Sequence, residues 1–357
     1  MIDVTLVVEG GYPFTVGGVS EWTGRLVAGL PDVSFAVASL RQPDEPERTP
    51  AYELPANVER VAEIESASEL PEARVYHARS TGAAGAFAAR AAAERGSRFV
   101  LSEHGLAWLE ARLGISACKP RSAPQDSVLV DAQTGDAYAQ AHAITAVCAA
   151  NARLQERAAR RAVRVIQNAV PLVPERHSEP GPPLVGFVGR VVPIKDVATF
   201  LRACRLVADE FLGSRFVVVG PLGHVPGYAR RCRELAGRLG LDVAFTGETD
   251  PGPWYERLDV LVLTSRSEAQ PLVALEAMAA GVPVVATDVG GCRELLAGAG
   301  LVTPVASPSA TAAAVVRLLR DEQLRMQLVA AGRARVAGQH EPSRMLRAFH
   351  ELYEAAA

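Results

Sequence analysis

Short apolar runs alternate with segments of helical periodicity along the whole chain. Apolar residues at positions 197, 200, 201, 204 and 207 follow the spacing of one face of an amphipathic helix. The runs between such helices are apolar at nearly every position, which is typical of parallel strands covered on both faces. The pattern therefore predicts an α/β fold with strands at Val4–Val8, Phe35–Ser39, Val75–His77, Phe99–Ser102, Ala143–Val147, Arg164–Gln167, Leu184–Val188, Phe216–Gly220, Val243–Thr246, Val260–Thr264 and Pro283–Thr287.

A segment rich in proline, glycine and polar residues interrupts this alternation at residues 174–183. The chain has 357 residues, which is more than one hydrophobic core commonly spans. We therefore expect an N-terminal Rossmann-like domain at 1–173, a linker at 174–183, a C-terminal Rossmann-like domain at 184–338 and a closing helix at 339–357. That helix carries one apolar face, formed by Met345, Phe349, Leu352 and Tyr353.

Composition narrows the class of protein. With 49% hydrophobic residues, 22% charged residues and a net charge of −3, the chain has no electrostatic case for nucleic acid or an anionic membrane. No run reaches the roughly 20 apolar residues of a membrane span, and the N-terminus lacks the basic region of a signal peptide. The five cysteines show no CxxC spacing, which favours reduced structural thiols in a cytoplasmic protein. The basic cluster Arg230-Arg231-Cys232-Arg233 is expected on a solvated helix face, and the oligomeric state is not readable.

Two loops that follow predicted strands could bind phosphate. Ligands of open α/β sheets bind at the carboxyl ends of the strands. Gly17 and Gly18 precede a helix and would let backbone amides approach an anion, although a tight turn without a ligand fits this loop equally well. Arg190 and Lys195 lie five residues apart between a strand and a helix, where two cations can neutralise a diphosphate. An exposed basic pair is the alternative for that loop.

A third loop and its helix, Ser265–Gly281, contain two isolated carboxylates. Pro271 suits the first helical position and Gly281 suits the position after the last turn. Between them every residue except Glu276 is apolar, so a polar group should meet this carboxylate. Glu268 is expected in the preceding loop, and both glutamates suit sugar hydroxyls as hydrogen-bond acceptors. The amides of Leu272 and Val273 at the helix start offer another phosphate site.

These motifs together resemble a known family. Gly189-Arg190 with Lys195-Asp196, followed by Glu268, seven residues, Glu276 and Ala-Met-Ala-Ala-Gly, strongly resembles the retaining glycosyltransferases of family four. The likeness covers nearly the whole C-terminal half. It implies the GT-B architecture: two doubly wound, Rossmann-like parallel-sheet domains that face each other across a cleft, with a C-terminal helix crossing back to the N-terminal domain.

A narrower likeness points to one branch of that family. Glu9-Gly-Gly-Tyr-Pro, Gly17-Gly-Val-Ser-x-Trp22, Ser102-Glu-His-Gly105 and Cys292-Arg-Glu-Leu resemble the PelF branch. That branch contains the soluble glycosyltransferase of the Pel exopolysaccharide system, which uses UDP-glucose. The N-terminal half is shorter than the PelF pattern, and since that half shapes the acceptor site, the acceptor is left open.

The resemblance implies roles for individual residues. Arg190 and Lys195 would hold the donor diphosphate beside Gly17 and Gly18, and Glu276 would contact the ribose. Glu268 would contact the transferred sugar, and His104 would line the reaction centre. The remaining donor-binding residues implied by the likeness are Gln270, Pro271, Leu272 and Val273, together with the nucleobase pocket at Thr246, Gly247 and Glu248.

The implied reaction moves a hexose, glucose by the PelF likeness, from a UDP-sugar to an acceptor hydroxyl with retention of configuration. No cofactor and no metal is expected, because the chain has no Asp-x-Asp and its cationic loop can stabilise the departing diphosphate. Family members often have glycine at position 269, so Ala269 requires a loop without a strongly positive φ. A non-catalytic nucleotide-sugar-binding or scaffold subunit is the alternative. An NAD-dependent oxidoreductase is disfavoured because no G-x-G-x-x-G follows a strand.

Overall fold

The computed structural model describes residues 1–15, 17–41, 48–112, 114, 127–175 and 181–356. The chain forms two compact units. The first comprises the described residues of 1–112, 122–168 and 343–357, and the second those of 113–121 and 169–342. Part of the expected linker, residues 176–180, lies outside the described residues, as does Cys118.

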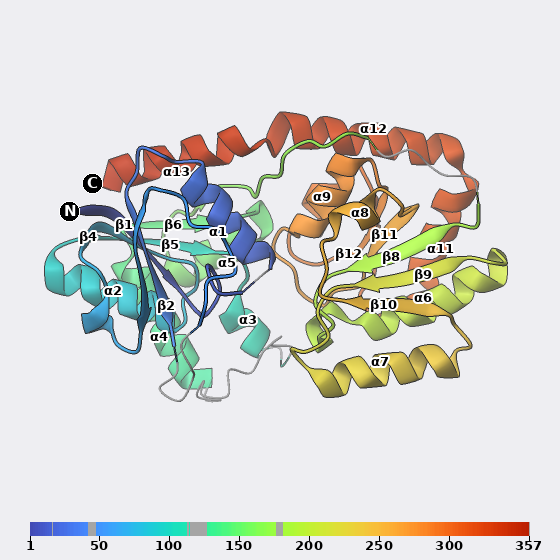
Figure 1. Ribbon diagram of the computed structural model, residues 1–357, viewed down its shortest axis with the longest axis horizontal. Coiled ribbons are helices and arrows are strands. Elements are labelled where there is room, and N and C mark those ends of the chain that lie inside the picture. Colours follow the sequence, from blue (N-terminus) through green and yellow to red (C-terminus); the bar gives the residue numbers. More distant parts are fainter. Residues whose placement is uncertain (16, 42–47, 113, 115–126, 176–180, 357) are drawn as a thin grey trace. The chain divides into compact units, whose positions relative to one another are not determined.

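The first unit contains a seven-stranded sheet in the order β3-β2-β1-β4-β5-β6-β7, with every pairing parallel. Because the chain builds outward from β1 to β3 and then returns beside β1 at β4, the strand order reverses between β1 and β4. The strands are β1 Ile2–Val8, β2 Phe35–Leu40, β3 Val58–Ile64, β4 Ala73–Ala78, β5 Arg98–Glu103, β6 Ala143–Ala146 and β7 Arg164–Val165. The helices are α1 Gly18–Ala28, η1 Ala67–Glu69, α2 Ala83–Arg95, α3 Ala107–Arg112, α4 Ser127–Gln140, α5 Ala149–Ala159 and α13 Pro342–Ala356 (Figure 1).

The second unit repeats this plan with six parallel strands in the order β10-β9-β8-β11-β12-β13. Its reversal lies between β8 and β11. The strands are β8 Leu184–Val188, β9 Arg215–Val219, β10 Val243–Gly247, β11 Val260–Leu263, β12 Val284–Thr287 and β13 Leu301–Thr303. The helices are η2 Pro193–Lys195, α6 Val197–Glu210, α7 Pro226–Arg238, α8 Gly252–Tyr255, α9 Leu272–Ala280, α10 Cys292–Leu296, α11 Pro308–Arg320 and α12 Glu322–Gln339. Both units are thus the doubly wound sheets expected from the sequence.

All the predicted strands are present, but β3 and β13 were missed. Both are edge strands. The segment Val58-Glu-Arg-Val-Ala-Glu-Ile64 carries three charged residues, and Glu59 and Arg60 are exposed. Charged side chains protect an open sheet edge from pairing with another chain, and they also remove the apolar run by which a buried strand is recognised. β13 has only three residues, too few to form a pattern.

The strands of the second unit separate two hydrophobic cores. Val217 and Val219 of β9 pack into one core with α9, whereas Val218 packs into the other with α6. This alternation follows from the opposite directions of successive side chains in a strand. The predicted helix face of α6, from Val197 to Val207, is buried in the second core, as the spacing requires.

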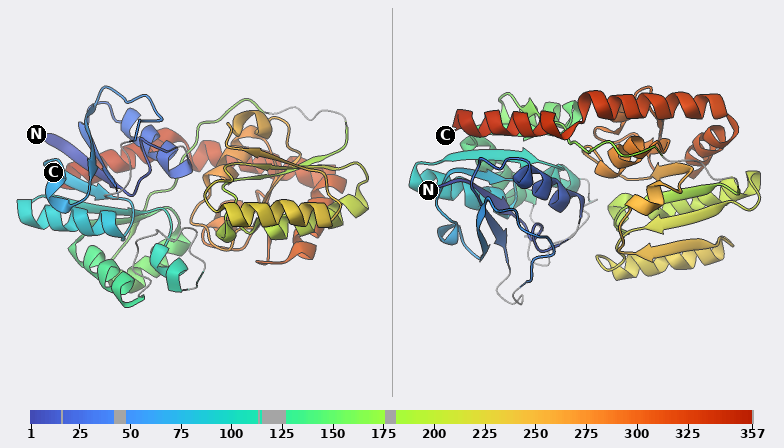
Figure 2. Two further views of the ribbon diagram at one scale, coloured as in Figure 1. Left: turned by 60° about the horizontal axis from the view of Figure 1, so that its bottom comes forward. Right: turned by 45° about the horizontal axis from the view of Figure 1, so that its top comes forward.

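The C-terminal helix α13 belongs to the first unit, which confirms that the chain crosses back to its N-terminal part. Its predicted apolar face is buried, and Figure 2 shows the helix running along that unit. The Tyr353 hydroxyl lies 2.7 Å from Nδ1 of the buried His77, whose Nε2 lies 2.7 Å from the Ser102 hydroxyl. Burial, with a smaller effect of Arg79, lowers the pKa of His77 to about 3, so the ring is neutral at neutral pH. A specific hydrogen bond thus accompanies the apolar packing of α13.

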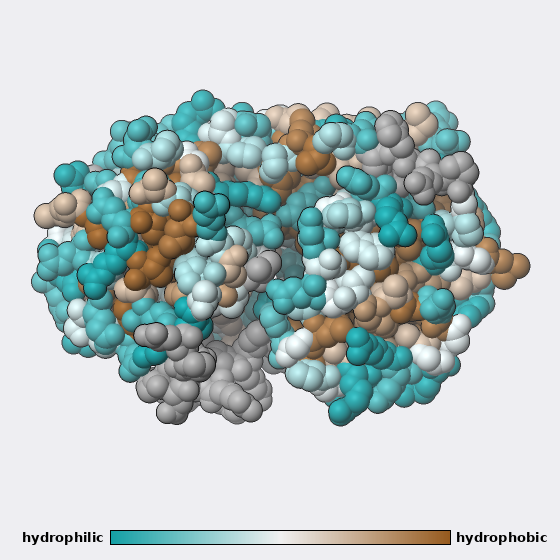
Figure 3. All heavy atoms as spheres, viewed as in Figure 1, coloured by the Kyte–Doolittle hydropathy of each residue, from teal (hydrophilic) through white to brown (hydrophobic). Residues whose placement is uncertain are grey.

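Two smaller predictions can be compared with the structure. The four described cysteines are buried thiols, in agreement with a structural role. Arg230, Arg231 and Arg233 are exposed on α7 while Cys232 is buried, and Figure 3 shows hydrophilic side chains over this helix. Among the described residues, no helix combines the length and the apolar character needed to cross a membrane.

Replacing Tyr353 by Phe should lower the free energy of unfolding of the first unit by about 1–3 kcal/mol, because His77 loses a buried hydrogen-bond partner. Urea unfolding in a Trp254→Phe background, followed by fluorescence, reports on this unit through Trp22 and Trp108. The exposed Glu354→Gln on the same helix is the control and should change the stability by less than about 0.5 kcal/mol. Equal stability of the two variants would show that the Tyr353–His77 contact contributes nothing.

Candidate functional site

The reversal of strand order in the second unit determines where the loops that carry the predicted site residues meet. β8 and β11 are hydrogen-bonded neighbours, and both run toward the same edge of the sheet. The loop of residues 189–196 follows β8, and the loop of residues 264–271 follows β11. In open α/β sheets this is the position at which ligands bind.

Side chains and backbone lock the two loops together. The buried Thr264 hydroxyl donates to the carbonyl oxygens of Asp196 at 2.9 Å and Lys195 at 3.2 Å. The amide of Arg266 donates to the carbonyl of Ile194 at 2.7 Å. Asp196 has a φ of 45°, and its carboxylate caps α6 by accepting hydrogen bonds from the amide and hydroxyl of Thr199. The backbone of Lys195 and of its two neighbours, Ile194 and Asp196, is therefore held by hydrogen bonds from the loop after β11.

Two of the predicted site residues form an ion pair. Lys195 Nζ contacts Glu268 Oε1, and the Ser265 hydroxyl donates to the same oxygen at 2.6 Å. The side chains of Lys195 and Glu268 are only 20% and 10% exposed, so solvent screens this pair less than a surface pair. The hydroxyl of Thr287, from β12, holds the carbonyl of Ser265 at 2.5 Å. Three adjacent strand ends thus fix the position of the Glu268 carboxylate.

The loop that contains Ala269 is supported by the turn after β12. Gly290 has a φ of +51°, and a Cβ atom there would lie 1.6 Å from the carbonyl oxygen of Glu268. The amide of Gly291 donates to the carbonyl of Ala269 at 2.7 Å. Among the described residues, the non-glycine positions with positive φ are Arg160, Asp196 and Ala306. Ala269 is not among them, so this loop forms without the backbone angle that only glycine adopts readily.

The helix α9 differs in two details from the prediction. Pro271 is the capping residue, with a ψ of 119°, and the helix begins at Leu272 rather than at the proline. The polar partner expected for Glu276 includes a side chain that the sequence did not suggest, because the Tyr255 hydroxyl donates to Glu276 Oε2 at 2.9 Å. Tyr255 ends α8, a four-residue helix with no pattern of its own. Gly281 has a φ of +78° and ends the helix as expected.

The structure also brings together the ends of β8, β9 and β10. Gly220, after β9, has a φ of +137°, and a Cβ there would lie 2.3 Å from the carbonyl oxygen of Gly189. The amide of Gly220 donates to the carbonyl of Gly247 at 3.1 Å, and the amide of Val191 donates to the carbonyl of Pro221 at 3.0 Å. Arg190 therefore shares one edge of the sheet with Thr246, Gly247 and Glu248.

The first unit holds the other predicted residues. Gly17 caps α1 and Gly18 is its first residue, while residue 16 lies outside the described residues. The amide of Gly17 donates to the Tyr52 hydroxyl at 3.4 Å. Arg79, which the sequence did not suggest, follows β4 and donates to the carbonyl of Val19 at 2.8 Å and to the hydroxyl of Thr23. It fixes the first turns of α1 behind the glycine pair.

His104 follows β5 in the same unit. Its ring lies edge-to-face against Trp22, with the ring centroids 4.1 Å apart. Its Nε2 is buried and forms no hydrogen bond with the described residues. Burial, then the charge of Arg79, then His77 lower the pKa of His104 to about 3. The imidazole is therefore neutral at neutral pH and can accept or donate one hydrogen bond at each ring nitrogen according to its tautomer.

A buried carboxylate, Glu103, precedes His104 and was not predicted. It accepts hydrogen bonds from Tyr138, from Gln155 Nε2 at 2.8 Å and from the Thr81 hydroxyl at 3.2 Å. Burial raises the pKa of Glu103 to about 7, against the effect of these three donors. Glu103 lies within the motif Ser102-Glu-His-Gly105, but periodicity assigned it no role, because a single glutamate at the end of an apolar strand is indistinguishable from a surface residue.

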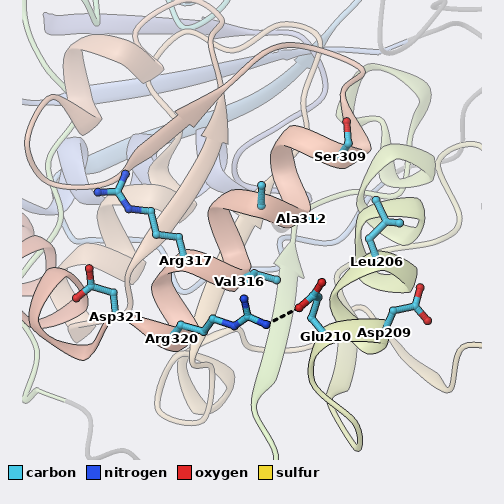
Figure 4. Close-up of a pocket in the computed structure, with 10 residues that line it drawn as sticks. Leu206, Asp209, Glu210, Ser309, Ala312, Val316, Arg317, Arg320 and Asp321 are labelled. Atoms are coloured by element: carbon cyan, nitrogen blue, oxygen red, sulfur yellow. Dashed lines mark hydrogen bonds and ion pairs between the residues drawn. The ribbon is translucent and has the colours of Figure 1, made fainter.

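The residues of the loops that follow β8, β9, β10 and β11 do not line the groove shown in Figure 4. That groove has a volume of about 570 Å³ and lies between α6 and α11. Glu210 and Arg320 form an ion pair across it. Its walls come from helices, whereas the candidate site is built from the loops that follow strands.

Comparison with known sequences divides along the two units. Residues 182–321 match the family model described as glycosyl transferases group 1, and residues 2–69 and 64–161 match a domain of unknown function, DUF3492. A D-inositol 3-phosphate glycosyltransferase of Thermomonospora curvata is 37% identical over 166 residues, which are 43% of this chain and 38% of that relative. One from Thermobispora bispora is 34% identical over 182 residues, 48% of this chain and 42% of the relative. The chain thus spans about two fifths of the length of these curated relatives.

Solved structures match over the whole chain. The sucrose-phosphate synthase of Thermosynechococcus elongatus has a TM-score of 0.83 at 18% identity and covers 99% of this chain and 98% of its own. HepE of Anabaena in complex with UDP-glucose has a TM-score of 0.78 at 17% identity, with 99% of each chain covered. The fold is GT-B. At these identities the likeness concerns the GT-B fold and not the ligand.

Glu103 predicts a specific pH dependence of stability. Its folded-state pKa of about 7 lies above the ordinary value of 4.5, so the native state binds more protons between these values. The stability that the protonated carboxyl contributes is complete below pH 4.5 and is lost as the pH rises through 7. The unfolding free energy of the wild type minus that of Glu103→Gln should therefore decrease by on the order of 3 kcal/mol as the pH rises across that window.

The two unfolding free energies are subtracted because the buried His77 and His104, whose pKa values are lowered, make both proteins more stable as the pH rises. This contribution is common to both proteins and cancels in the difference. Urea titrations at several pH values measure it. A difference that stays constant from pH 4.5 to 7 would contradict the raised pKa of Glu103.

Proposed function

We propose that this protein is a retaining hexosyltransferase that moves glucose from UDP-glucose to an acceptor hydroxyl. One observation carries the proposal: the reversal point of the second sheet holds Lys195 and Glu268 in contact, on loops of a segment that matches glycosyl transferases group 1. Residues 184–338 would form the donor domain and residues 1–173 the acceptor-side domain, joined by the linker 174–183, with residues 339–357 as the closing helix. The acceptor is unidentified.

The donor diphosphate would bind Arg190 and Lys195. Arg190 can hold phosphate oxygens with its planar fork, and Lys195 adds a point charge that Glu268 and the Thr264 contacts keep in place. The first amides of α9, at Leu272 and Val273, lie at the positive end of a helix that begins at the same edge. Gln270 and Pro271 shape the chain between these groups. The diphosphate would thus meet two cations and a helix start.

The two glutamates would bind the ends of the donor. A carboxylate accepts several hydrogen bonds, so Glu276 can bind a ribose hydroxyl while it accepts one from Tyr255. Glu268 would accept from the transferred sugar while it contacts Lys195. Thr246, Gly247 and Glu248, at the end of β10, would surround the nucleobase. UDP-glucose is the donor proposed because the motifs of this chain resemble those of the PelF branch, whose glycosyltransferase uses UDP-glucose.

The proposed chemistry needs no protein nucleophile. The bond between the anomeric carbon and the phosphate oxygen breaks, the acceptor oxygen bonds to the same face of that carbon, and the acceptor proton passes to the leaving phosphate. The negative charge that develops on the diphosphate is stabilised by Arg190 and Lys195, which supply the positive charge that a metal ion supplies elsewhere. From the first unit, His104, which is neutral and packs against Trp22, would line the reaction centre. Gly17 and Gly18 would lie beside the diphosphate.

Arg190→Met should reduce release of nucleoside diphosphate from the sugar donor by about 100-fold or more, because one cation is removed from the leaving group. Hydrolysis of UDP-glucose without acceptor, followed by chromatography of UDP, measures this. Arg230→Met, on the exposed face of α7, is the matched control and should hydrolyse the donor at the wild-type rate. Near-normal turnover of Arg190→Met would overturn the phosphate assignment, whereas donor binding without any hydrolysis by the wild type would indicate a non-catalytic subunit.

Lys195 needs a different design, since Lys195→Met alone leaves the partly buried Glu268 without its ion-pair partner. We expect the double variant Lys195→Met/Glu268→Gln to unfold at a higher temperature than Lys195→Met, because it removes both charges. Both variants should hydrolyse the donor about 100-fold more slowly than the wild type. A double variant with wild-type hydrolysis would show that neither charge takes part.

A further inference from the structure

His224 lies at the same sheet edge as the proposed donor site but belongs to none of its motifs. It follows β9 in the loop Gly220-Pro-Leu-Gly-His224, just before α7, and its side chain is exposed. What distinguishes His224 is the position of its loop, which backbone contacts join to the loop after β8 and to the end of β10.

Three backbone contacts fix the loop of His224 between its neighbours. Val191 donates to the carbonyl of Pro221 at 3.0 Å, which ties this loop to that of Arg190. Gly220 approaches Gly189 so closely that no side chain fits between them. The amide of Gly220 donates to the carbonyl of Gly247 at 3.1 Å, which ties the loop to the end of β10. The loop that carries His224 is thus joined through its first residues, Gly220 and Pro221, to the loop of Arg190 and to the end of β10, which Glu248 follows.

The charges around the imidazole come from those two neighbours. Partial burial, the larger cause, and Arg190 lower the pKa of His224, whereas Glu248 raises it. Before a ligand binds, burial and Arg190 therefore disfavour the protonated form of the ring. A diphosphate on Arg190 would compensate the charge that opposes protonation and add negative charge nearby, and both changes favour the imidazolium.

We propose that His224 is a donor-site residue that takes up a proton from solvent when a nucleoside diphosphate sugar places its phosphates on Arg190, and that the imidazolium then donates a hydrogen bond to a phosphate oxygen. This inference rests on the proposed function, because it needs a diphosphate at Arg190. It assigns the ligand by its chemistry, a diphosphate diester, which itself takes up no proton near neutral pH. The proton comes from the buffer, and one imidazole can take up no more than one.

Isothermal titration calorimetry of the whole chain measures this uptake. The wild type is titrated with UDP-glucose at about pH 7, where histidine titrates, in buffers of different ionisation enthalpy. The observed enthalpy should vary with the buffer by a slope that corresponds to a fraction of one proton taken up. His224→Gln keeps hydrogen-bonding groups but cannot be protonated, so its slope should be close to zero. His350→Gln, on α13 of the first unit, is the control and should retain the wild-type slope.

The pH dependence of affinity gives a second readout. Wild-type Kd for UDP-glucose should fall as the pH falls from about 8 to 6, and His224→Gln should bind about tenfold more weakly than the wild type at the lower pH. Uridine, which lacks phosphates, should produce no proton uptake in either protein. The inference is overturned if wild type and His224→Gln show the same slope, or if uridine reproduces the slope of UDP-glucose.

The outcomes also separate the two proposals. Titration with ADP-glucose and GDP-glucose in parallel shows whether another base is preferred. If any of these donors binds in an Arg190-dependent manner without proton uptake by His224, the inference fails and the proposed function stands. If none of them binds, both are overturned.

Discussion

The candidate site depends on the buried hydroxyl of Thr264 at the end of β11. Its hydrogen bonds to the carbonyls of Lys195 and Asp196 join the loop after β8 to the loop after β11. These strands are neighbours at the reversal of strand order, which is where open α/β sheets bind their ligands. The ion pair of Lys195 with Glu268 and the cap of Asp196 on α6 are formed by residues of the two loops that this connection joins.

A second constraint is the close approach of backbone at glycines. Gly220 against Gly189 and Gly290 against Glu268 leave no room for a Cβ atom, and both contacts lie where loops follow strands. Such contacts set the spacing of the loops more strictly than side chains could, since backbone atoms cannot change rotamer. The polar groups they position, Arg190 and Glu268 among them, are those to which we assign the donor.

Much of this could be predicted from the sequence. The apolar strands, the faces of α6 and α13 and the position of Glu268 in a loop after β11 follow from periodicity and from punctuation by proline and glycine. The edge strand β3 could not, because its charges hide the apolar pattern. Tyr255 on Glu276 and Arg79 behind α1 come from segments distant in the chain, and only the folded structure shows those contacts. His224 was missed for the same reason, since its surroundings are created by pairing of β8, β9 and β10.

The central claim is that the second unit binds a nucleoside diphosphate sugar at the ends of β8 and β11. A thermal-shift screen of the whole chain against UDP-, GDP- and ADP-sugars tests it most directly, because a ligand that binds only the folded state raises the unfolding temperature. The account predicts that UDP-glucose raises this temperature in a concentration-dependent manner and that free glucose does not. An unfolding temperature that none of the nucleotide sugars changes would contradict it.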